Sequence, residues 1–400
     1  MNYRNLLKQE VNYSICLFMI LPILFFSMSQ VSAVSVEMQE TDLSPSGEAS
    51  TFHIASDNSI LLVDDNNELW VFNAVDWQYI HYEGVGGDNL ADIAIESPTK
   101  IWWTDNGTSF GSLDLNTHTF KVWEVSESTT GNIPNLGPIV FAEGFVWMPT
   151  WFGTTFGLFR FNISSETLDL FPYTGGSFAA DMVYSDGILW SLDWSKQSLM
   201  KFDIDTGALV KITPNPAREI YDTANVQVDG STVWWTEDKM NGAVISYDSG
   251  LSAMAAYQLP ENTDPRNLCL QDGLVWYSNE NGTIGRIDPD QATSASLDFM
   301  VTTYPEEITP ESYDVTGPIT STISSPSTGG FSFTGFDSDF SEGDGLQVYT
   351  LPESAVPWGI IVINDFVIVA DNGRQKLIRF PLEDLSGDEE FQYLPLILMQ

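Results

Sequence analysis

Acidic side chains recur at one position of a repeated phrase, directly after a short apolar run. One copy reads Trp102-Trp103-Thr104-Asp105. Carboxylate oxygens that converge on one site are the ligands preferred by Ca²⁺ and Mg²⁺, so these residues predict a divalent-cation site if the fold brings them together. The alternative is that each carboxylate accepts N–H groups from its own or a neighbouring turn. The acids at this position are Asp64, Asp105, Asp193, Glu237 and Asp371, and Asn279 and Thr150 replace them in two further copies.

Aromatic side chains and one arginine follow or precede the same apolar runs. Aromatic rings with a few polar groups on a concave surface are typical of sites for a sugar, a peptide loop or a flat small molecule. We therefore expect a ligand at this end of the repeats. The predicted contact residues are Trp151, Trp194, Tyr221, Arg266 and Trp358. Other tryptophans, including Trp102, Trp147, Trp190, Trp234 and Trp276, are predicted to pack between repeats.

A second acidic cluster lies in the segment Phe336-Asp-Ser-Asp-Phe-Ser-Glu-Gly-Asp-Gly345. Asp337, Asp339 and Asp344 are close in sequence and lie next to glycines. The segment resembles a calcium loop, but its glycine is at the seventh position and no glutamate follows at the twelfth, as an EF-hand requires. It predicts either a calcium site or a plain acidic turn.

The elements that must position these groups are short strands. In the clearest copy, residues 265–289, the runs 267–270, 274–278 and 283–287 alternate apolar and polar residues. Asp272-Gly273 separates the first two runs, and an Asn-Gly pair precedes the third. Alternation punctuated in this way is typical of consecutive β-hairpins.

The repeat spacing predicts an all-β fold. Alignment on the first residue of the phrase gives steps of 41 to 45 residues and one of 92, which is the period of four-stranded β-propeller blades. Seven blades fit best, with six or eight as alternatives. We assign residues 51–400 to the propeller and 291–344 to a Ser-, Thr-, Pro- and Gly-rich insertion within blade six. The rival interpretation of the insertion is a degenerate blade around residues 331–336. The aligned residues are Leu61, Trp102, Trp147, Trp190, Trp234, Trp276 and Ile368.

The termini carry further information. Residues 1–33 have a basic start, an apolar run and Val31-Ser32-Ala33, which is the pattern of a cleaved signal peptide. We therefore expect a secreted, periplasmic or cell-surface protein with no membrane insertion of the mature chain. Residues 34–50 are a linker or a closing strand. Ring closure by pairing of the chain ends can use either residues 36–41 or residues 391–395.

Composition limits the partners. The chain has 55 acidic and 15 basic residues and a net charge of −40, so nucleic acid and anionic lipid surfaces are excluded as expected partners. Of the two cysteines, Cys16 lies in the predicted signal and Cys269 in a predicted strand. The mature chain therefore has no intrachain disulfide, and we expect a monomer.

Several phrases together resemble one known family. Leu274-Val-Trp-Tyr-Ser-Asn279 with Ile284-Gly-Arg-Ile-Asp288, and Val348-Tyr-Thr-Leu-Pro352 before Pro357-Trp-Gly-Ile360, are similar to the streptogramin (virginiamycin B) lyase family of β-propellers. The resemblance implies a C–O lyase that opens a cyclic depsipeptide with a base and a magnesium ion. It also implies histidines at the start of the innermost strands. Here those positions hold Thr51, Ala91, Gly137, Ala180, Thr223, Arg266 and Trp358.

Two functions are consistent with these residues. The first is an exported, non-enzymatic module that binds a small molecule, a glycan or a protein. Its ligand would bind at the mouth of the propeller's central channel, where the acids and aromatic residues are expected. The second is a lyase or lactonase that depends on a divalent cation, calcium or magnesium, with His53, Glu237 or Arg266 as catalytic candidates. Because His53 lies two residues after Thr51, strand alternation turns it to the same side.

Overall fold

The repeated phrases form strands because their side chains alternate between two neighbouring apolar layers. The computed structural model describes residues 34–42, 49–56, 59–64, 68–83, 85, 90–105, 107–126, 136–150, 157–173, 181–193, 197–215, 225–237, 242–304, 308–343 and 345–382. At 34–37, 49–56, 59–64, 337–340 and 342 it describes the backbone alone. Residues 35–400 form one compact unit.

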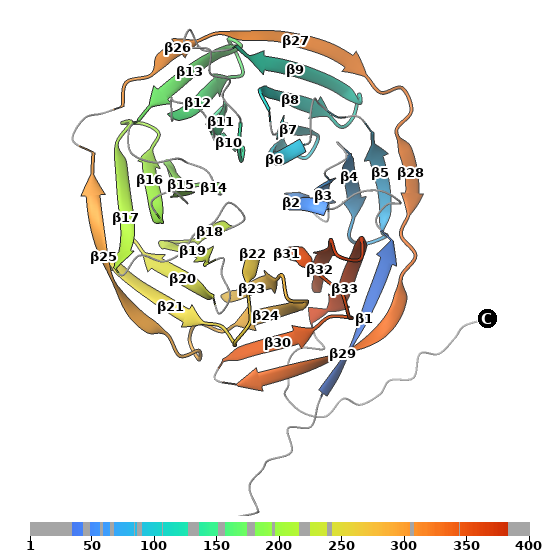
Figure 1. Cartoon of the computed structure of the whole chain (residues 1–400). Coiled ribbons are helices and arrows are strands. Elements are labelled where there is room, and N and C mark those ends of the chain that lie inside the picture. The colour runs from blue at the N-terminus through green and yellow to red at the C-terminus, as the bar shows by residue number, and fades with distance from the viewer. Residues whose placement is uncertain are drawn as a thin grey trace, which may run out of the picture. The chain divides into compact units, whose positions relative to one another are not determined.

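Consecutive strands pair in antiparallel meanders arranged around a central axis (Figure 1). We number the meanders in chain order. Meanders 1 to 3 comprise β2 (Ala49–Ser56), β3 (Ser59–Asp64), β4 (Leu69–Asn73) and β5 (Gln78–Tyr82); β6 (Leu90–Ser97), β7 (Lys100–Asp105), β8 (Ser109–Asp114) and β9 (Thr119–Val125); and β10 (Val140–Ala142), β11 (Phe145–Pro149), β12 (Gly157–Asn162) and β13 (Thr167–Pro172).

Meanders 4 to 7 follow the same order from the axis outward. Their strands are β14 (Met182–Ser185), β15 (Ile188–Asp193), β16 (Ser198–Asp203) and β17 (Leu209–Asn215); β18 (Val226–Asp229), β19 (Thr232–Thr236), β20 (Ala243–Asp248) and β21 (Ala253–Gln258); β22 (Pro265–Gln271), β23 (Leu274–Asn279), β24 (Thr283–Ile287) and β30 (Leu346–Thr350); and β31 (Pro357–Ile363), β32 (Phe366–Asp371), β33 (Lys376–Pro381) and β1 (Val34–Asp42).

The turns between first and second strands follow the Asp-Gly prediction. In meander 6, Gln271 pairs with Leu274 across Asp272 and Gly273, whose φ angles are 53° and 77°. Two successive residues with positive φ are the geometry of a type I′ hairpin, which Asp-Gly favours.

Adjacent tryptophans of one phrase point into opposite apolar layers. Trp234 packs with Val275 of meander 6, whereas Trp235 packs with Trp190 of meander 4. Since side chains alternate along a strand, each second strand contributes to the cores on both of its sides. The last core joins Trp70 of meander 1 to residues of meander 7, so the apolar layers continue around the ring.

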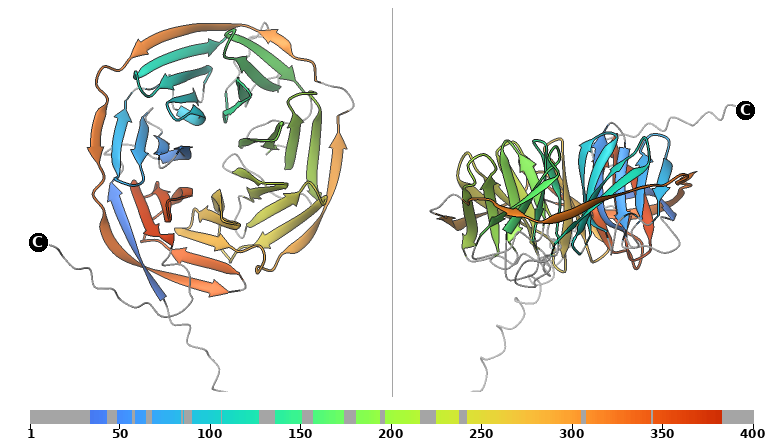
Figure 2. Two further views of the ribbon diagram at one scale, coloured as in Figure 1. Left: turned by 180° about the vertical axis from the view of Figure 1, so that it is seen from behind. Right: turned by 90° about the horizontal axis from the view of Figure 1, so that it is seen from above.

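A long segment leaves meander 6 after its third strand and returns as its fourth. Its strands are β25 (Ala295–Thr303), β26 (Glu311–Tyr313), β27 (Val315–Thr322), β28 (Ser327–Gly330) and β29 (Thr334–Gly343). β25 pairs with β21 and then β17, β26 with β13, β27 with β9, and β28 with β5. β29 lies between β30 and β1. We call residues 295–343 the outer strap, because they run around the outside of the meanders in both views of Figure 2.

Aromatic residues dock the strap between meanders 1 and 7. The Phe331 ring lies 5.4 Å from that of Phe72, and the Phe333 ring lies 4.8 Å from that of Trp77. The strands on either side of them, β28 and β29, belong to the sheets of meanders 1, 6 and 7. In the described ranges, residues 331–336 therefore add to existing sheets and cores.

The strand at residues 36–41 is one of the two predicted candidates for ring closure. β1 pairs with β33, from Gln39 opposite Arg379 to Asp42 opposite Lys376. The Lys376 ammonium lies 2.6 Å from an Asp42 carboxylate oxygen. The other candidate, residues 391–395, lies outside the described residues, as does the predicted signal peptide. No helix in the described ranges has the length and apolar character needed to cross a bilayer.

Candidate functional site

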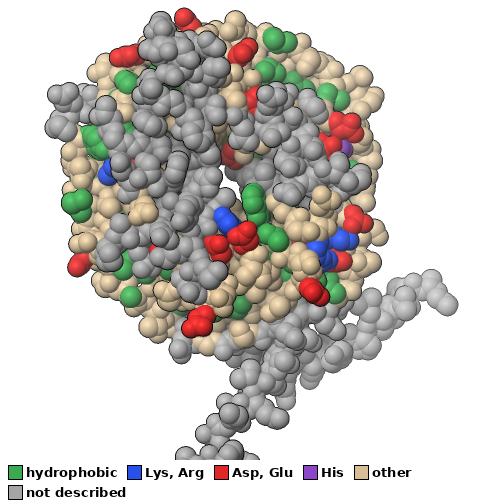
Figure 3. Space-filling view, viewed as in Figure 1, with side chains coloured by type: hydrophobic (Ala, Val, Ile, Leu, Met, Phe, Trp, Pro, Cys, Tyr) green, Lys and Arg blue, Asp and Glu red, His purple; other side chains and the backbone are tan. Residues whose placement is uncertain are grey.

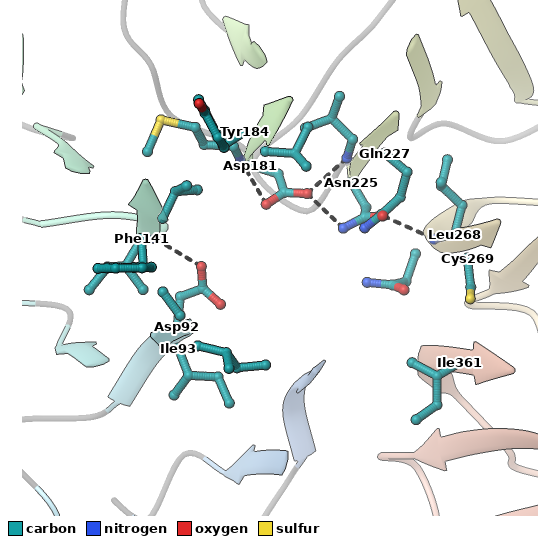
Figure 4. Close-up of a pocket in the computed structure, with 18 of the residues that line it drawn as sticks. Asp92, Ile93, Phe141, Asp181, Tyr184, Asn225, Gln227, Leu268, Cys269 and Ile361 are labelled. Atoms are coloured by element: carbon teal, nitrogen blue, oxygen red, sulfur yellow. Dashed lines mark hydrogen bonds between the residues drawn. The ribbon is translucent and has the colours of Figure 1, made fainter. Parts of the chain in front are cut away.

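The innermost strands surround a cavity of about 390 Å³ (Figure 4). Residues on or next to β6, β10, β14, β18, β22 and β31 line it. Apolar side chains form much of the wall, and a few polar groups interrupt them. The polar and ionisable lining residues are Asp92, Asp181, Tyr184, Asn225, Gln227, Asn267 and Cys269.

Asp181, immediately before β14, is held by three N–H donors. The Met182 backbone N–H donates to its Oδ1 at 2.8 Å. Its Oδ2 accepts from the Val226 backbone N–H at 2.8 Å and from the Asn225 side-chain amide at 2.6 Å. Two of these donors belong to meander 5, so the carboxylate links neighbouring meanders while it lines the cavity.

The same kind of link, a side-chain oxygen that accepts a backbone N–H of the next meander, recurs among the innermost strands, which we call the inner rim. Asp92 of meander 2 accepts from the Ile139 backbone N–H at 2.9 Å, and Asn225 accepts from the Leu268 backbone N–H at 3.3 Å. In each case the acceptor lies near the start of an innermost strand and the donor belongs to the next meander. Hydrogen bonds between meanders therefore fix Asp92, Asp181 and Asn225 in the wall of the cavity.

Sequence reasoning missed these residues by one or two positions. Alignment with the family's histidines selected Ala91, Ala180, Thr223 and Arg266. The cavity is instead lined by Asp92, Asp181, Asn225 and Asn267. The available signal was a polar residue one position after the aligned residue for Asp92, Asp181 and Asn267, and two positions after it for Asn225.

Hydroxyl groups one residue before the position of the predicted acids make a second set of links between meanders. In meander 6 that position holds Asn279. Thr104 donates to the Gly137 carbonyl at 2.8 Å, and Ser278 donates to the Trp358 carbonyl at 3.0 Å. Thr236 donates to a carbonyl of meander 6 at 3.2 Å. The residue before the acid thus connects the second strand to the next meander's innermost strand.

The predicted acids Asp105 and Asp371 are engaged in their own turns. Asp105 Oδ1 accepts from the N–H groups of Gly107 and Ser109, both at 2.9 Å. Asp371 Oδ1 accepts from the Arg374 N–H of its own turn at 3.3 Å and from the Val356 N–H, in the connection before β31, at 2.8 Å. The Asp371 side chain is fully buried. Burial raises the pKa of Asp371, while backbone N–H donors oppose that rise. These hydrogen bonds match the alternative stated from the sequence, in which each carboxylate accepts N–H groups from its own or a neighbouring turn.

The other two described acids of this set are also buried. Asp193 lies 2.7 Å from the Lys211 ammonium, and both side chains are almost inaccessible. Glu237 is fully buried. None of these four acids is among the described residues that line the cavity. Within the described part of the chain, no three His, Cys, Asp or Glu side chains are grouped closely enough to hold a metal ion.

Arg266 and Trp358 are the predicted contact residues that the structure describes. The Arg266 guanidinium pairs with Glu280, and Trp358 is half-buried. Figure 3 shows acidic side chains spread over one face, with one basic patch near its centre and the other basic side chains towards its edges. Neither residue is among those lining the cavity.

The remaining candidates stay predictions. Trp151, Trp194, Tyr221 and Asp344 lie outside the described residues. For four further candidate residues the structure describes the backbone alone. These are His53 on β2, Asp64 on β3, and Asp337 and Asp339 on β29.

Cys269 is a free thiol on β22. Burial raises its pKa to about 11, so the group is a neutral thiol at physiological pH. It can therefore line the cavity without adding charge to it.

The fold defines the protein class, and solved structures agree. The chain is a β-propeller. It is similar to the RRP9 WD40 repeats, with TM-score 0.53, 8% identity and coverage of 86% of this chain and 97% of that one. It is also similar to the extracellular domain of BT4673, described as a hybrid two component system from B. thetaiotaomicron, with TM-score 0.53, 9% identity, 86% of this chain and 40% of that one.

Sequence comparison adds no narrower assignment. No family model matches the chain, and no curated protein matches it. At 8 to 9% identity the structural neighbours show the fold alone.

Proposed function

We propose that this chain is an exported, seven-bladed β-propeller that acts as a binding module, with the central cavity as its ligand site. The cavity carries the proposal: polar groups converge in it and are fixed by hydrogen bonds between meanders. Sites of this kind, preformed and mainly apolar with a few placed polar groups, are typical of ligand binding.

The blade count rests on the cores. Each meander shares one apolar cluster with the preceding meander and another with the next, and the cluster around Trp70 and Ile368 joins the last to the first. Counting each meander as one blade gives seven. Export rests on the signal-peptide pattern of residues 1–33.

A lyase or lactonase resembling the streptogramin lyases is the alternative. It would need a base and a divalent cation near one carbonyl group. Asp105 and Asp371 support turns, and the aligned histidine positions hold other residues. Because the cavity-lining groups are mainly amides and apolar side chains, we favour binding without catalysis.

A fragment screen by ligand-observed NMR tests the binding proposal. Gln227→Trp fills the cavity, whereas Leu251→Trp adds the same ring at a site that is 78% exposed. We expect fragments that bind the unaltered chain and Leu251→Trp but not Gln227→Trp. Equal binding to both variants, with both folded by circular dichroism, would place the fragments elsewhere and refute the proposal.

A further inference from the structure

We propose that the central cavity binds a neutral amide, a primary carboxamide or lactam on an apolar body, through the side chains of Gln227 and Asn267. This inference rests on the proposed function, because it names the ligand class of the same site. Its basis is a division of labour in the cavity wall. The side chains of Asp92, Asp181 and Asn225 bond to neighbouring meanders, whereas two amide side chains remain available to a ligand.

The innermost strands place polar lining side chains at two levels of the cavity. Register puts Gln227 of β18 and Cys269 of β22 at equivalent positions, each opposite the aligned tryptophan of its second strand. Asn225 and Asn267 lie two residues earlier on the same strands, so alternation turns them to the same side. All four residues line the cavity. Two neighbouring strands therefore supply four polar side chains to one part of the wall.

Asn225 and Asn267 occupy equivalent positions but have different surroundings. The Asn225 side chain donates to Asp181 and accepts from the Leu268 N–H. The Asn267 backbone N–H donates to a β23 hydroxyl at 3.3 Å, and its side-chain amide makes no hydrogen bond within the described part of the chain. Pairing between β22 and β23 is irregular around Asn267, and such bulges redirect side chains. The Asn267 amide is therefore available to a ligand.

The Gln227 side chain provides the second amide. It is half-buried, lines the cavity and makes no hydrogen bond to any other described residue. A primary amide offers N–H donors and a carbonyl acceptor on one planar group, so it can exchange two hydrogen bonds with an amide ligand. A ligand without these groups would displace water from Gln227 and Asn267 and leave them without partners, which costs free energy.

The rest of the wall favours an apolar, uncharged ligand body. Ile93 and Ile361 lie across the cavity from Asp181 in the view of Figure 4. Cys269 adds a neutral thiol, since burial raises its pKa to about 11. A charged ligand would have to lose its hydration among such side chains, which costs far more than the same loss for a neutral amide.

Four planar probes of similar size test the inference: benzamide, acetophenone, benzoate and benzamidine. Acetophenone keeps the carbonyl but lacks N–H groups, benzoate is an anion, and benzamidine is a cation at neutral pH. Their affinities for the purified full chain are measured by NMR titration. We expect benzamide to bind about tenfold more tightly than each of the others. Equal binding of benzamide and acetophenone, or tighter binding of either charged probe, would overturn the inference.

One substitution at two positions locates the recognition. Gln227→Met removes the amide from the cavity. Gln271→Met is the control, because Gln271 lies on β22 outside the described cavity lining and donates to Asp272 at 3.1 Å. Benzamide affinity should fall about tenfold in Gln227→Met alone, with acetophenone affinity unchanged. Full benzamide affinity in Gln227→Met, or an equal loss in both variants, would reject the inference.

Asn267→Leu tests the second amide. Because the Asn267 amide makes no hydrogen bond within the described chain, its loss should leave the urea midpoint nearly unchanged. Benzamide affinity should fall about tenfold while acetophenone affinity stays the same. An equal fall for both probes would show that the cavity recognises shape and not the amide, and would overturn the inference.

The same probes separate this inference from the proposed function. If benzamide and acetophenone bind the unaltered chain equally and Gln227→Trp abolishes both, the cavity remains a ligand site and the amide is rejected. Benzamide binding that survives in Gln227→Trp would reject both.

Discussion

The inner and outer rims of this propeller join neighbouring meanders in different ways. At the inner rim, single side chains such as Asp92, Asp181 and Thr104 bond to the next meander's backbone. At the outer rim, the strap adds a backbone strand to one meander after another. The first arrangement leaves room for a cavity with placed polar groups, whereas the second joins the meanders mainly through backbone pairing.

This difference predicts where substitutions matter. Large exposed side chains on the strap include Met300 and Ile319, which are 60% and 73% exposed. Side chains at the inner rim make links between meanders and line the cavity.

The largest effect is expected in the core between the rims. Trp234 is 7% exposed and packs against Tyr257 with ring centroids 5.4 Å apart. Trp234→Ala should lower the free energy of unfolding by about 3–5 kcal/mol, because it leaves a cavity between meanders 5 and 6. Urea denaturation measures the loss, and a change under about 1 kcal/mol would mean that Trp234 does not anchor the meander.

The strap should depend on its docked aromatics rather than its exposed residues. Phe333 packs on Trp77, and the Arg379 guanidinium lies 3.8 Å from its ring centroid. Phe333→Ala should cost about 1–3 kcal/mol, since the side chain is half-buried. Ile319→Ala is the control and should stay within about 0.5 kcal/mol. Equal losses of unfolding free energy in the two variants would contradict the view that the docked aromatic residues, and not the exposed ones, hold the strap.

Loss of one hydrogen-bonded link between meanders at the inner rim should lower the free energy of unfolding by a smaller but measurable amount. Asp181→Asn leaves one acceptor oxygen for three N–H donors and brings an NH₂ group towards donors. We expect a loss of about 1–2 kcal/mol in urea denaturation. Asp298→Asn on the strap should change stability by less than about 0.5 kcal/mol. If the two variants matched, the inner links would not contribute to stability.

The smallest effects are expected at turns after the third strands, where an Asp or Asn accepts backbone N–H groups. The Thr206 backbone N–H lowers the pKa of Asp203, as the Thr117 and Leu251 N–H groups do for Asp114 and Asp248. A lowered folded-state pKa stabilises the fold above the usual Asp pKa of about 3.9, and this contribution is lost as pH falls through the lower folded value.

Asp203→Asn should therefore reduce the acid sensitivity of stability slightly. Asn fits this turn, because Asn73 and Asn162 occupy the equivalent position in meanders 1 and 3. Each accepts from the N–H two residues on, and Asn162 also accepts from the N–H three residues on. Urea midpoints at pH 6 and pH 3 measure the effect. A steeper loss of stability in the variant than in the unaltered chain would contradict the assignment.

Local patterns predicted the meanders well. Trp102, Trp234 and Trp276 pair with equivalent residues of their first strands, Ala94, Gln227 and Cys269. Alternation and turn residues act within a few positions of the chain, so they are visible in sequence. The partners of the strap are distant in sequence, and a strand such as Val315–Thr322 is exposed on most of its length and shows no apolar alternation. Its course could not be predicted for that reason.

The site was predicted less well than the fold. The acids after the second strands predicted a cation site because they recur at one position. In the structure, Asp105 and Asp371 accept hydrogen bonds from backbone N–H groups of turns. Asp92 and Asp181 share only a short pattern, an alanine before and an apolar residue after, and their position depends on how each first strand enters the inner rim. Only the packed ring shows which side chain faces the cavity.

The most direct test of the two-rim account is hydrogen exchange measured by mass spectrometry, with and without a saturating fragment from the NMR screen. We predict slow exchange in strap strands β25 and β27 in both states, because their backbones pair with the meanders. Added protection should appear only in peptides that contain the innermost strands β6, β10, β14, β18, β22 and β31, which line the cavity. Fast exchange in the strap, or ligand protection at the outer strands instead of the inner ones, would contradict the account.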